Sequence, residues 1–403
     1  MSSEWHRITF GEFISLQRGH DLPEQEREDG NVPILGSFGV TGWHSTAKAK
    51  GPGLTIGRSG ASFGVATYTD KDYFPLNTTL YVTDFNGNHP RFAYYFAKDF
   101  DFSAFNSGSA QPSLNRNFIN PVKVSIPPIA EQKAIAHILG TLDDKIELNR
   151  KTNETLEATA RALFQSWFVD FDPVRAKAAG RSTGLPDAIS DLFPDSFEES
   201  ELGEIPRGWD VGCLSDCCEI TMGQSPPGDT YNEEGVGLPF YQGKTDFGFR
   251  FPGRRIYCTS STRQASEGAT LISVRAPVGS ANVAKELCAI GRGIAALKSR
   301  QDAKSFVYYL IGTLQNIFES YNSEGTVFGA INGKNLASIM VTVPEVKVIS
   351  AFNAKCSSVD EMIKKNTEEA EVLASIRDTL LPKLISGELR IPEAEKLLEQ
   401  AGV

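Results

Sequence analysis

Apolar residues recur with a seven-residue period in two long stretches of the chain. In the first stretch the core heptad positions are Ile135, Leu139, Leu142, Ile146, Asn149, Asn153, Leu156, Ala160, Leu163 and Trp167. In the second stretch they are Phe352, Cys356, Val359, Ile363, Asn366, Ala370, Leu373, Arg377, Leu380 and Leu384. A heptad pattern sustained over about five repeats predicts two long helices that pair as a coiled coil. The alternative is two amphipathic helices that pack separately, each on its own domain.

Prolines and a glycine set the expected ends of these helices. Pro127-Pro128 precedes the first stretch and Asp172-Pro173 ends it. We expect Pro382 to kink or break the second helix near Leu381 and Gly387 to end it.

Each stretch has an asparagine at its middle heptad position, Asn149 in the first and Asn366 in the second. A buried asparagine weakens a coiled coil but fixes its register. If the helices run antiparallel, their midpoints cross, and we expect Asn149 and Asn366 to lie close together. The alternative for each asparagine is an exposed position on an imperfect apolar stripe.

The chain also repeats itself at an offset of 217 residues. Ser113-Leu-Asn115 matches Ala330-Ile-Asn332, and Leu142-Asp-Asp-Lys-Ile146 matches Val359-Asp-Glu-Met-Ile363. Arg58 matches Arg275 at the same offset. The repeat predicts two copies of one unit, a globular block followed by a long helix. The expected segments are a globular domain (1–128), a helix (129–172), a linker (173–203), a second globular domain (204–344), a second helix (345–388) and a C-terminal tail (389–403).

The globular blocks combine short strands with a few helices. Runs rich in β-branched residues at 53–57, 80–83 and 269–274 lie between turn residues, whereas 91–99 and 304–320 are typical of helices. Because strands and helices alternate irregularly, we predict an α+β fold with two similar globular domains and an antiparallel pair of long helices.

Composition and charge narrow the class of protein. Hydrophobic residues make up 40% and charged residues 22%, which is typical of a soluble globular protein. No apolar run approaches the ~18 residues of a membrane span, and the N-terminus lacks a signal-peptide pattern, so we expect a cytoplasmic protein. The net charge of −10 argues against a nucleic-acid partner. However, most of the excess acid lies in 129–203 and 345–403, so the globular blocks can still concentrate Lys and Arg on one face.

The sequence contains no recognisable catalytic constellation. It has no phosphate loop, no nucleophile elbow and no dinucleotide fingerprint. Cys213-x3-Cys217-Cys218 is followed by no further ligand at zinc spacing, so we expect the six cysteines to be free thiols and no metal to be bound. The sequence therefore favours binding over catalysis.

Five motifs together resemble a known family. They are Ile126-Pro-Pro-Ile-Ala-Glu-Gln-Lys133, Leu142-Asp-Asp-Lys-Ile146, Ala162-Leu-Phe-Gln-Ser-Trp-Phe168, Leu202-Gly-Glu-Ile-Pro-Arg-Gly-Trp209 and Leu380-Leu-Pro-Lys-Leu-Ile-Ser-Gly-Glu388. As a set they resemble the specificity subunit of type I restriction–modification systems. The second helix departs from this pattern, because Val343-Pro-Glu-Val-Lys-Val-Ile349 lacks the paired prolines and the Glu-Gln.

The resemblance implies a non-catalytic subunit that binds double-stranded DNA. Each globular domain would recognise one half of a bipartite target, and the helices would set the spacer and dock two methyltransferase subunits. S-adenosylmethionine, ATP and Mg would be bound by those partners and by restriction/translocase subunits, not by this chain. Two alternatives remain open: a helical scaffold or adaptor without DNA specificity, and a hydrolase with an unrecognised site.

Base recognition requires Arg, Lys or small polar side chains on loops that reach a DNA groove. In the first block the candidates are Lys48, Lys50, Arg58, Ser59, Gln111, Asn115 and Arg116, the last three on the loop 106–117. In the second block they are Gln242, Lys244, Arg250, Arg254, Arg255, Arg263, Arg275, Asn332 and Lys334. Arg58 and Arg275 stand out because they occupy matching repeat positions. For the others a solvated surface role is an equal alternative, and for Asn115 and Asn332 a turn-forming role is a strong one.

Overall fold

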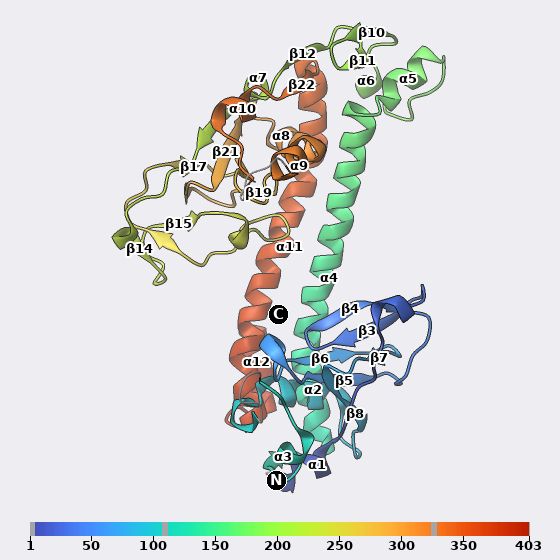
Figure 1. The fold of residues 1–403 in the computed structure, drawn as a ribbon, viewed down its shortest axis with the longest axis vertical. Helices are drawn as coiled ribbons and strands as arrows, with labels where there is room; N and C mark the ends of the chain where they lie inside the picture. The colour runs from blue at the N-terminus through green and yellow to red at the C-terminus, as the bar shows by residue number, and fades with distance from the viewer. Residues whose placement is uncertain (1–4, 107–111, 324–328, 403) are drawn as a thin grey trace. The chain divides into compact units, whose positions relative to one another are not determined.

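The computed structural model describes residues 5–106, 112–323 and 329–402. The chain divides into two compact units, one comprising Met1–Arg150 with Glu368–Val403 and the other Lys151–Thr367. Each unit contains one globular domain and one part of each long helix, α4 (Ile129–Phe168) and α11 (Val346–Ser386) (Figure 1). The repeat in the sequence predicts units in which a domain is followed by its own helix. The compact units of the structure instead each combine one domain with parts of both helices.

The domain of unit 1 is built on three small sheets. A two-stranded sheet pairs β1 (His6–Thr9) with β9 (Lys123–Ile126). A four-stranded antiparallel sheet has the order β2 (Ser15–Arg18), β8 (Thr79–Asp84), β5 (Gly53–Gly57), β6 (Ala66–Thr69). The third sheet has the order β4 (Gly39–His44), β3 (Val32–Gly36), β7 (Phe74–Pro75). The helices are α1 (Phe10–Phe13), α2 (Pro90–Asp99) and α3 (Arg116–Ile119).

The domain of unit 2 repeats this plan. A two-stranded sheet pairs β12 (Asp210–Cys213) with β22 (Met340–Val343). The four-stranded sheet has the order β13 (Cys218–Met222), β21 (Ile294–Ser299), β18 (Thr270–Ser273), β19 (Ala281–Val283). A five-stranded sheet has the order β14 (Tyr231–Asn232), β16 (Tyr257–Cys258), β15 (Leu238–Tyr241), β20 (Cys288–Ile290), β17 (Gln264–Ala265). The helices are α7 (Leu214–Cys217), α8 (Lys304–Thr313), α9 (Gln315–Ser323) and α10 (Gly333–Ala337).

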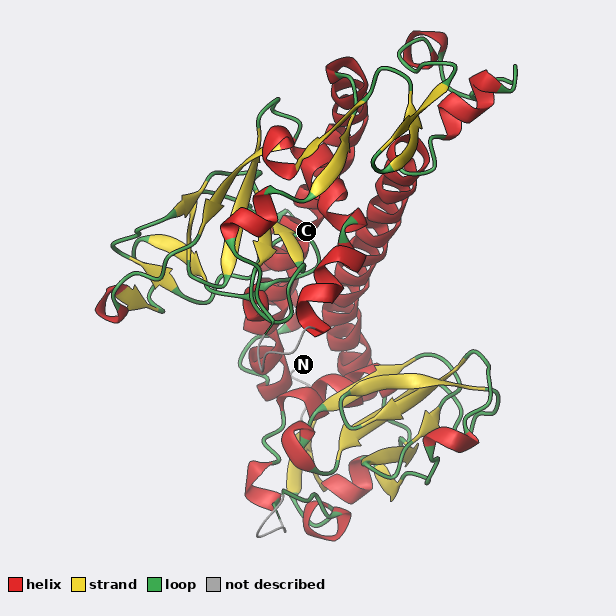
Figure 2. Cartoon of the chain, turned by 45° about the horizontal axis from the view of Figure 1, so that its top comes forward, coloured by secondary structure: helices red, strands yellow, loops and turns green. Residues whose placement is uncertain are grey.

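The matching sheet orders confirm the predicted α+β class and the internal repeat. In both domains a short helix leads into the edge strand of a four-stranded antiparallel sheet, and the first and last strands of the domain pair with each other. Figure 2 shows most of the strands gathered in the two globular parts and the long helices outside the sheets.

Within each unit the long helices pack antiparallel. In unit 1, Arg377 on α11 forms an ion pair with Asp143 on α4 (2.7 Å), and Asn149 donates to Glu369 Oε2 (2.8 Å). In unit 2, Asn366 Nδ2 donates to Asn153 Oδ1 (2.9 Å). As the residue numbers on α4 increase from 143 to 153, the numbers of their partners on α11 decrease from 377 to 366, so the two helices run in opposite directions. Most of the predicted apolar core positions are buried, including Leu139, Leu142, Trp167, Phe352, Ile363 and Leu380.

Asn149 and Asn366, which we expect to lie close together, each form a hydrogen bond with another residue. Asn366 instead meets Asn153, which is 5% exposed and also donates to the Thr367 hydroxyl (3.2 Å). Asn149 and Asn153 differ by one helical turn, so the helices are paired one turn away from the register that alignment of the two midpoints predicts.

Three further segments differ from expectation. Helix α11 continues through Pro382 to Ser386, because Leu384 and Ile385 are buried in the core of unit 1 and hold the last turn. The expected linker 173–203 forms α5 (Asp172–Ala178), α6 (Asp187–Ser190) and a hairpin of β10 (Phe197–Ser200) and β11 (Gly203–Pro206). The expected tail forms α12 (Ile391–Ala401), whose Ala394 is buried in the core of unit 1.

The Asn153–Asn366 hydrogen bond allows a test of how register is specified. The single substitution Asn153→Leu leaves the Asn366 amide without this partner and should lower the free energy of unfolding by ~1 kcal/mol. The double substitution Asn153→Leu/Asn366→Leu places two apolar side chains together and should restore or exceed the parent stability. Denaturant unfolding of the parent, the single variant and the double variant measures this difference. A double variant that is less stable than the single one would contradict the assignment.

Candidate functional site

A cationic hollow lies at one end of the four-stranded sheet in unit 1. Arg18 ends β2, Arg58 follows β5, and Arg116 begins α3. We call it the first hollow; its lining residues are Gln17, Arg18, Gly19, His20, Asp21, Arg58, Leu80, Ser113, Leu114, Asn115 and Arg116. The lining includes three arginines and one aspartate, so the hollow favours an anionic partner.

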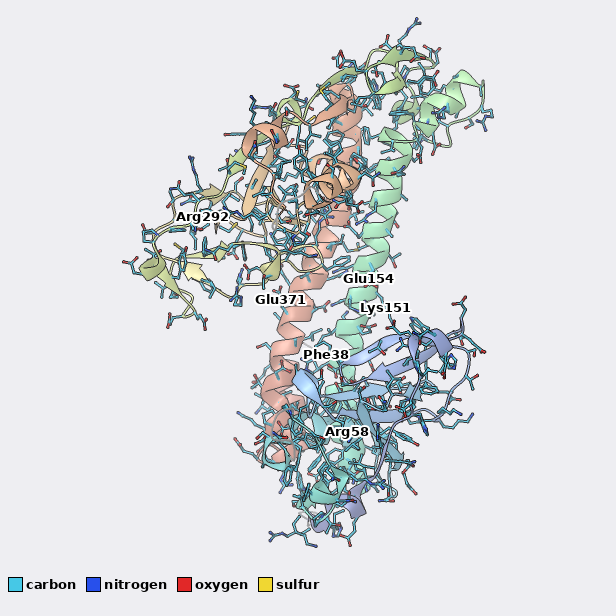
Figure 3. The ribbon with its side chains drawn as sticks, viewed as in Figure 1. Phe38, Arg58, Lys151, Glu154, Arg292 and Glu371 are labelled. Carbon is cyan, nitrogen blue, oxygen red and sulfur yellow. The ribbon has the colours of Figure 1, made fainter. Side chains whose placement is uncertain are left out.

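A second cationic hollow lies at the corresponding place in unit 2. The second hollow is lined by Ser225, Gln242, Gly243, Lys244, Thr245, Arg275, Ala276, Pro277, Arg292 and Gly293. Its lining includes three cations, Lys244, Arg275 and Arg292, and no carboxylate. Figure 3 shows Arg58 in the first domain and Arg292 in the second.

The two hollows are equivalent, but Arg58 and Arg275 are not equivalent residues. Thr55 pairs with Tyr81 in the first domain, and the corresponding pair in the second is Leu271 with Ala296. In the same way, Leu114 N donates to Arg58 O (2.7 Å), whereas Ile331 N donates to Val274 O (3.0 Å).

The hydrogen-bonded ladder therefore aligns Arg58 with the buried Val274, and Arg275 with Ser59. The expectation that Arg58 and Arg275 occupy matching positions is wrong by one residue. Each arginine nevertheless lines the hollow of its own domain. Near these arginines the structural offset is 216 residues and not 217. A shift of one residue leaves the sheet order unchanged, so a constant offset of 217 along the sequence did not reveal it.

Backbone contacts orient several side chains of the hollows. Arg116 Nη1 donates to the carbonyl of Leu16 (2.9 Å), which fixes the guanidinium beside the end of β2. In the second hollow, Gln242 Nε2 lies 3.4 Å from both Ser225 Oγ and Tyr231 OH. Ser225 Oγ also accepts from the backbone N–H of Arg292 (3.3 Å), so one hydroxyl connects the amide and the arginine.

Asn115 and Asn332 have structural roles. Asn115 Oδ1 accepts from Asn117 N (3.0 Å) at the start of α3, and Asn332 Oδ1 accepts from Asn335 N (2.9 Å) at the start of α10. Both are helix N-caps, which is the local role that asparagine favours. Asn115 also lines the first hollow.

Five of the other predicted cations and polar residues lie outside both hollows. Ion pairs hold Lys50 to Asp72 (3.0 Å), Arg254 to Glu286 (2.6 Å) and Arg255 to Asp246 (3.0 Å). The first two pairs are exposed, and such pairs contribute about 0–1 kcal/mol and can open when a phosphate competes, whereas the Asp246 side chain is only 5% exposed. Lys48 and Lys334 are exposed without lining a hollow.

The four remaining candidate DNA-contacting residues lie outside the hollows, outside the described residues, or in the protein interior. Ser59 is half-buried beside Arg58, and Arg263 is exposed; neither lines a hollow. Gln111 lies outside the described residues. Arg250 is 3% exposed and held by acidic residues, so its assignment as a DNA-contacting residue is wrong.

Sequence reasoning missed Arg18 and Arg292. Both adjoin glycines that allow a close backbone approach: a Cβ at Gly19 would lie 2.1 Å from Leu76 O, and a Cβ at Gly293 would lie 2.1 Å from Gln242 O. The run Gly291-Arg292-Gly293 was the available signal, because an arginine between two glycines suits a surface that a ligand approaches closely.

The described residues show no reactive cysteine, no metal site and no membrane-spanning helix. The six cysteines are unpaired thiols, and burial raises the pKa of Cys218, Cys288 and Cys356 to about 12 each, which makes them poor nucleophiles. Within residues 5–106, 112–323 and 329–402, no three His, Cys, Asp or Glu side chains gather as metal ligands would. In the same ranges no helix has the length and apolarity needed to cross a membrane.

The importance of the close backbone approach at Gly223, beside the second hollow, can be tested by comparison with Gly243, which has open space around it. Gly223→Ala forces a methyl group onto the Gly291 carbonyl and should lower the free energy of unfolding by ~1–3 kcal/mol. Gly243→Ala is the matched control, because no atom lies within 4 Å of its added Cβ although it lines the same hollow. Denaturant unfolding of both variants gives the comparison. Equal stability of the two variants would show that the approach at Gly223 relaxes without cost.

Comparison with known proteins gives a consistent result. A protein of Methanocaldococcus jannaschii named as the MjaX specificity subunit of a type I restriction enzyme is 31% identical over 339 residues, covering 81% of this chain and 75% of the relative. The type I restriction enzyme HindI specificity subunit of Haemophilus influenzae is 28% identical over 388 residues, covering 79% and 82%. The crystal structure of a type I restriction–modification S subunit from M. genitalium superimposes with a TM-score of 0.64 at 16% identity, covering 95% and 96%, and so shares the fold.

The family model described as "Type I restriction modification DNA specificity domain" matches residues 2–158 and again 206–371. The two matches repeat one model along most of the chain, in agreement with the two similar domains of the structure. The chain therefore belongs to the family of type I restriction–modification DNA specificity subunits.

Proposed function

We propose that this chain is the non-catalytic DNA-specificity subunit of a type I restriction–modification complex and that each hollow recognises one half of a bipartite target. The observation that carries the proposal is the presence of two cationic hollows at equivalent places in two domains of the same topology. A repeated recognition surface on one chain suits a target that itself has two parts.

The chemistry of the lining residues suits base and phosphate contacts. Arginine binds guanine bidentately in the major groove, and lysine and arginine both neutralise phosphates. The first hollow carries Arg18, Arg58 and Arg116, whereas the second carries Lys244, Arg275 and Arg292. Because the side chains differ in type and position, the two halves of the target should differ in sequence.

The long helices would act as the spacer and as the platform for two methyltransferase subunits. Together they carry 12 acidic and 11 basic side chains, so their net charge of −1 gives them no attraction for a phosphate backbone and leaves their exposed faces to a protein partner. The methyltransferase subunits would bring S-adenosylmethionine, and restriction/translocase subunits would bring ATP and Mg. Acting on DNA in that assembly places the chain in the cytoplasm.

A helical scaffold without DNA specificity is the second candidate function. The long exposed helices would suit it, but it gives the two cationic hollows no role. The dependence of DNA binding on salt distinguishes the two functions, because phosphate contacts make affinity fall steeply as salt rises. Weak binding with no salt dependence would favour the scaffold.

Each hollow should control one half of the target. Arg58→Ala should weaken recognition at one base pair of one half-site by ~1–3 kcal/mol, and Arg275→Ala should do the same in the other half-site. The measurement is binding of the assembled methyltransferase to DNAs that carry single-base changes in either half. Lys50→Ala removes an exposed cation outside the hollows and serves as the control.

The pattern of loss separates base contacts from phosphate contacts. A variant that loses affinity for one half-site alone supports the assignment. Uniform weakening on all sequences, with a salt slope smaller by about one, would make that arginine a phosphate contact and contradict the base-reading role.

The helix pair should control the spacer. Four residues inserted between Arg150 and Lys151, with four more between Thr367 and Glu368, add about one turn to each helix, or ~6 Å, and keep the apolar stripes roughly in phase. Because each base pair rises ~3.4 Å, the preferred spacer should grow by about one or two base pairs while both half-sites stay the same. Mapping of methylated sites in cells measures both quantities. New half-sites with the old spacer would refute the role of the helices.

A further inference from the structure

Arg250 is a buried cation held by groups from three different elements of unit 2. It lies in the loop between β15 and β16, and only 3% of it is exposed. Its Nη1 donates to Glu157 Oε2 on α4 (2.5 Å) and to the Tyr309 hydroxyl on α8 (3.0 Å). Its Nη2 donates to Asp360 on α11. One guanidinium from the globular domain thus binds both long helices.

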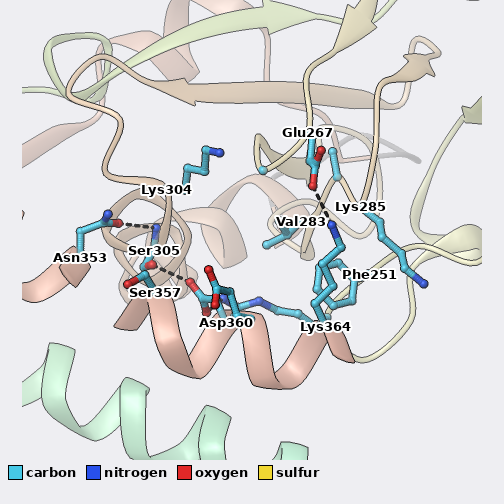
Figure 4. A pocket seen from close by; sticks show the side chains of 14 residues that line it. Phe251, Glu267, Val283, Lys285, Lys304, Ser305, Asn353, Ser357, Asp360 and Lys364 are labelled. Carbon is cyan, nitrogen blue, oxygen red and sulfur yellow. Dashed lines mark hydrogen bonds and ion pairs between the residues drawn. The ribbon is translucent and has the colours of Figure 1, made fainter. Parts of the chain in front are cut away.

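Aromatic and hydroxyl groups complete this cluster, which we call the Arg250 anchor (Arg250, Glu157, Asp360, Ser305, Tyr308, Tyr309). The guanidinium carbon lies 3.8 Å from the centre of the Tyr308 ring. Ser305 Oγ donates to Asp360 Oδ2 (2.5 Å), and Figure 4 shows this bond at the wall of the pocket between the domain and α11. Burial raises the pKa of Asp360, and Arg250 and Ser305 oppose that shift by favouring the carboxylate.

Unit 1 contains a related cluster with a different arginine. Asp143 on α4 is the repeat counterpart of Asp360 and accepts from the Tyr95 hydroxyl (2.6 Å). Tyr95 ends the run Phe92-Ala-Tyr-Tyr95, which matches Phe306-Val-Tyr-Tyr309 at an offset of 214, so it is the counterpart of Tyr309. The arginine that binds Asp143 is Arg377 on α11 (2.7 Å), so that ion pair joins helix to helix. An ion pair joins the domain to α4 in unit 1, between Arg91 and Asp144, whose carboxyl side chain is 67% exposed.

The two domains are therefore attached to the helices in different ways. An exposed ion pair contributes little, whereas removing one partner of a buried ion pair leaves an uncompensated charge and is strongly destabilising. A planar guanidinium that spans two acids also fixes orientation, which an ammonium group does not. The domain of unit 2 is held in one position on the helices by a geometrically specific contact.

The anchor is directly connected to the second hollow. Gln242 and Lys244 line the hollow, and the chain runs from them to Arg250 within the same short loop. Asn282 holds this loop by two hydrogen bonds to Gly248, each 3.0 Å, and Val283 N donates to Arg250 O (2.8 Å). The loop is thus tied to β19 at the point where it enters the anchor, so a shift of the anchor displaces the hollow.

We propose that Arg250 is a positioning residue that fixes where the second hollow lies along the helix pair and thereby restricts the complex to a single spacer length. The proposal rests on the proposed function of the hollows. Arg250 touches no DNA in this account. It acts through the loop that carries Gln242 and Lys244.

The test compares variants of the anchor in cells that carry the full complex, with sequencing of all methylated sites. Arg250→Met should keep both half-sites but raise methylation at sites whose spacer is one base pair shorter or longer by at least tenfold. Arg250→Lys should show a smaller effect in the same direction, because lysine keeps the positive charge but lacks the planar guanidinium that binds both acids at once. Arg254→Met is the control, because Arg254 lies in the same loop but forms an exposed ion pair with Glu286, and it should keep the parent spacer.

A folding defect is separated from loss of positioning by a charge-balanced variant. Arg250→Met/Glu157→Gln/Asp360→Asn removes the cation and both acids together, so no unpaired charge is buried, and it should fold and show the same broadened spacer. A single parental spacer in this variant or in Arg250→Met would overturn the proposal. If the parent complex methylates no bipartite site, the proposed function itself fails, which is a distinct result.

Discussion

The antiparallel register between α4 and α11 determines which residues can meet in each unit. Because the start of α4 pairs with the end of α11, unit 1 is assembled from the two ends of the chain and unit 2 from its middle. Each domain therefore packs on two helices that belong to different copies of the repeat. The buried acids follow the same logic, since Asp143 and Asp360 occupy matching repeat positions, yet one is on α4 and the other on α11. An insertion in one helix alone would break both the register and these contacts.

Charge is divided between the parts of the molecule according to their partners. The hollows concentrate Arg18, Arg58 and Arg116 in one domain and Lys244, Arg275 and Arg292 in the other. Half of the net charge of −10 comes from residues 169–203, which carry eight acidic and three basic side chains, whereas α4 and α11 together contribute only −1. A negative net charge is thus compatible with a DNA-binding role, because long-range repulsion is screened beyond ~10 Å while the hollows act at contact distance.

Periodicity and repetition predicted the architecture, whereas contacts between distant residues could not be predicted. The heptads located α4 and α11, and the repeat located two similar domains, because both signals depend on regular spacing within the sequence. The pairing of Asn366 with Asn153 depends on a shift of one helical turn, and the alignment of Arg275 with Ser59 on a shift of one residue in a strand. Neither shift changes the hydrophobic pattern. Arg250 looked like any loop arginine, because its burial depends on Glu157 and Asp360, each about a hundred residues away in sequence.

The most direct test of this account is single-molecule sequencing of methylated DNA from a host that expresses the chain with its methyltransferase subunit. Two unlike hollows on one helix pair predict one bipartite methylated sequence, with two halves that differ in sequence and a spacer of fixed length. A continuous target, or two identical halves in inverted orientation, would contradict the account, because neither requires two different recognition surfaces on a single chain.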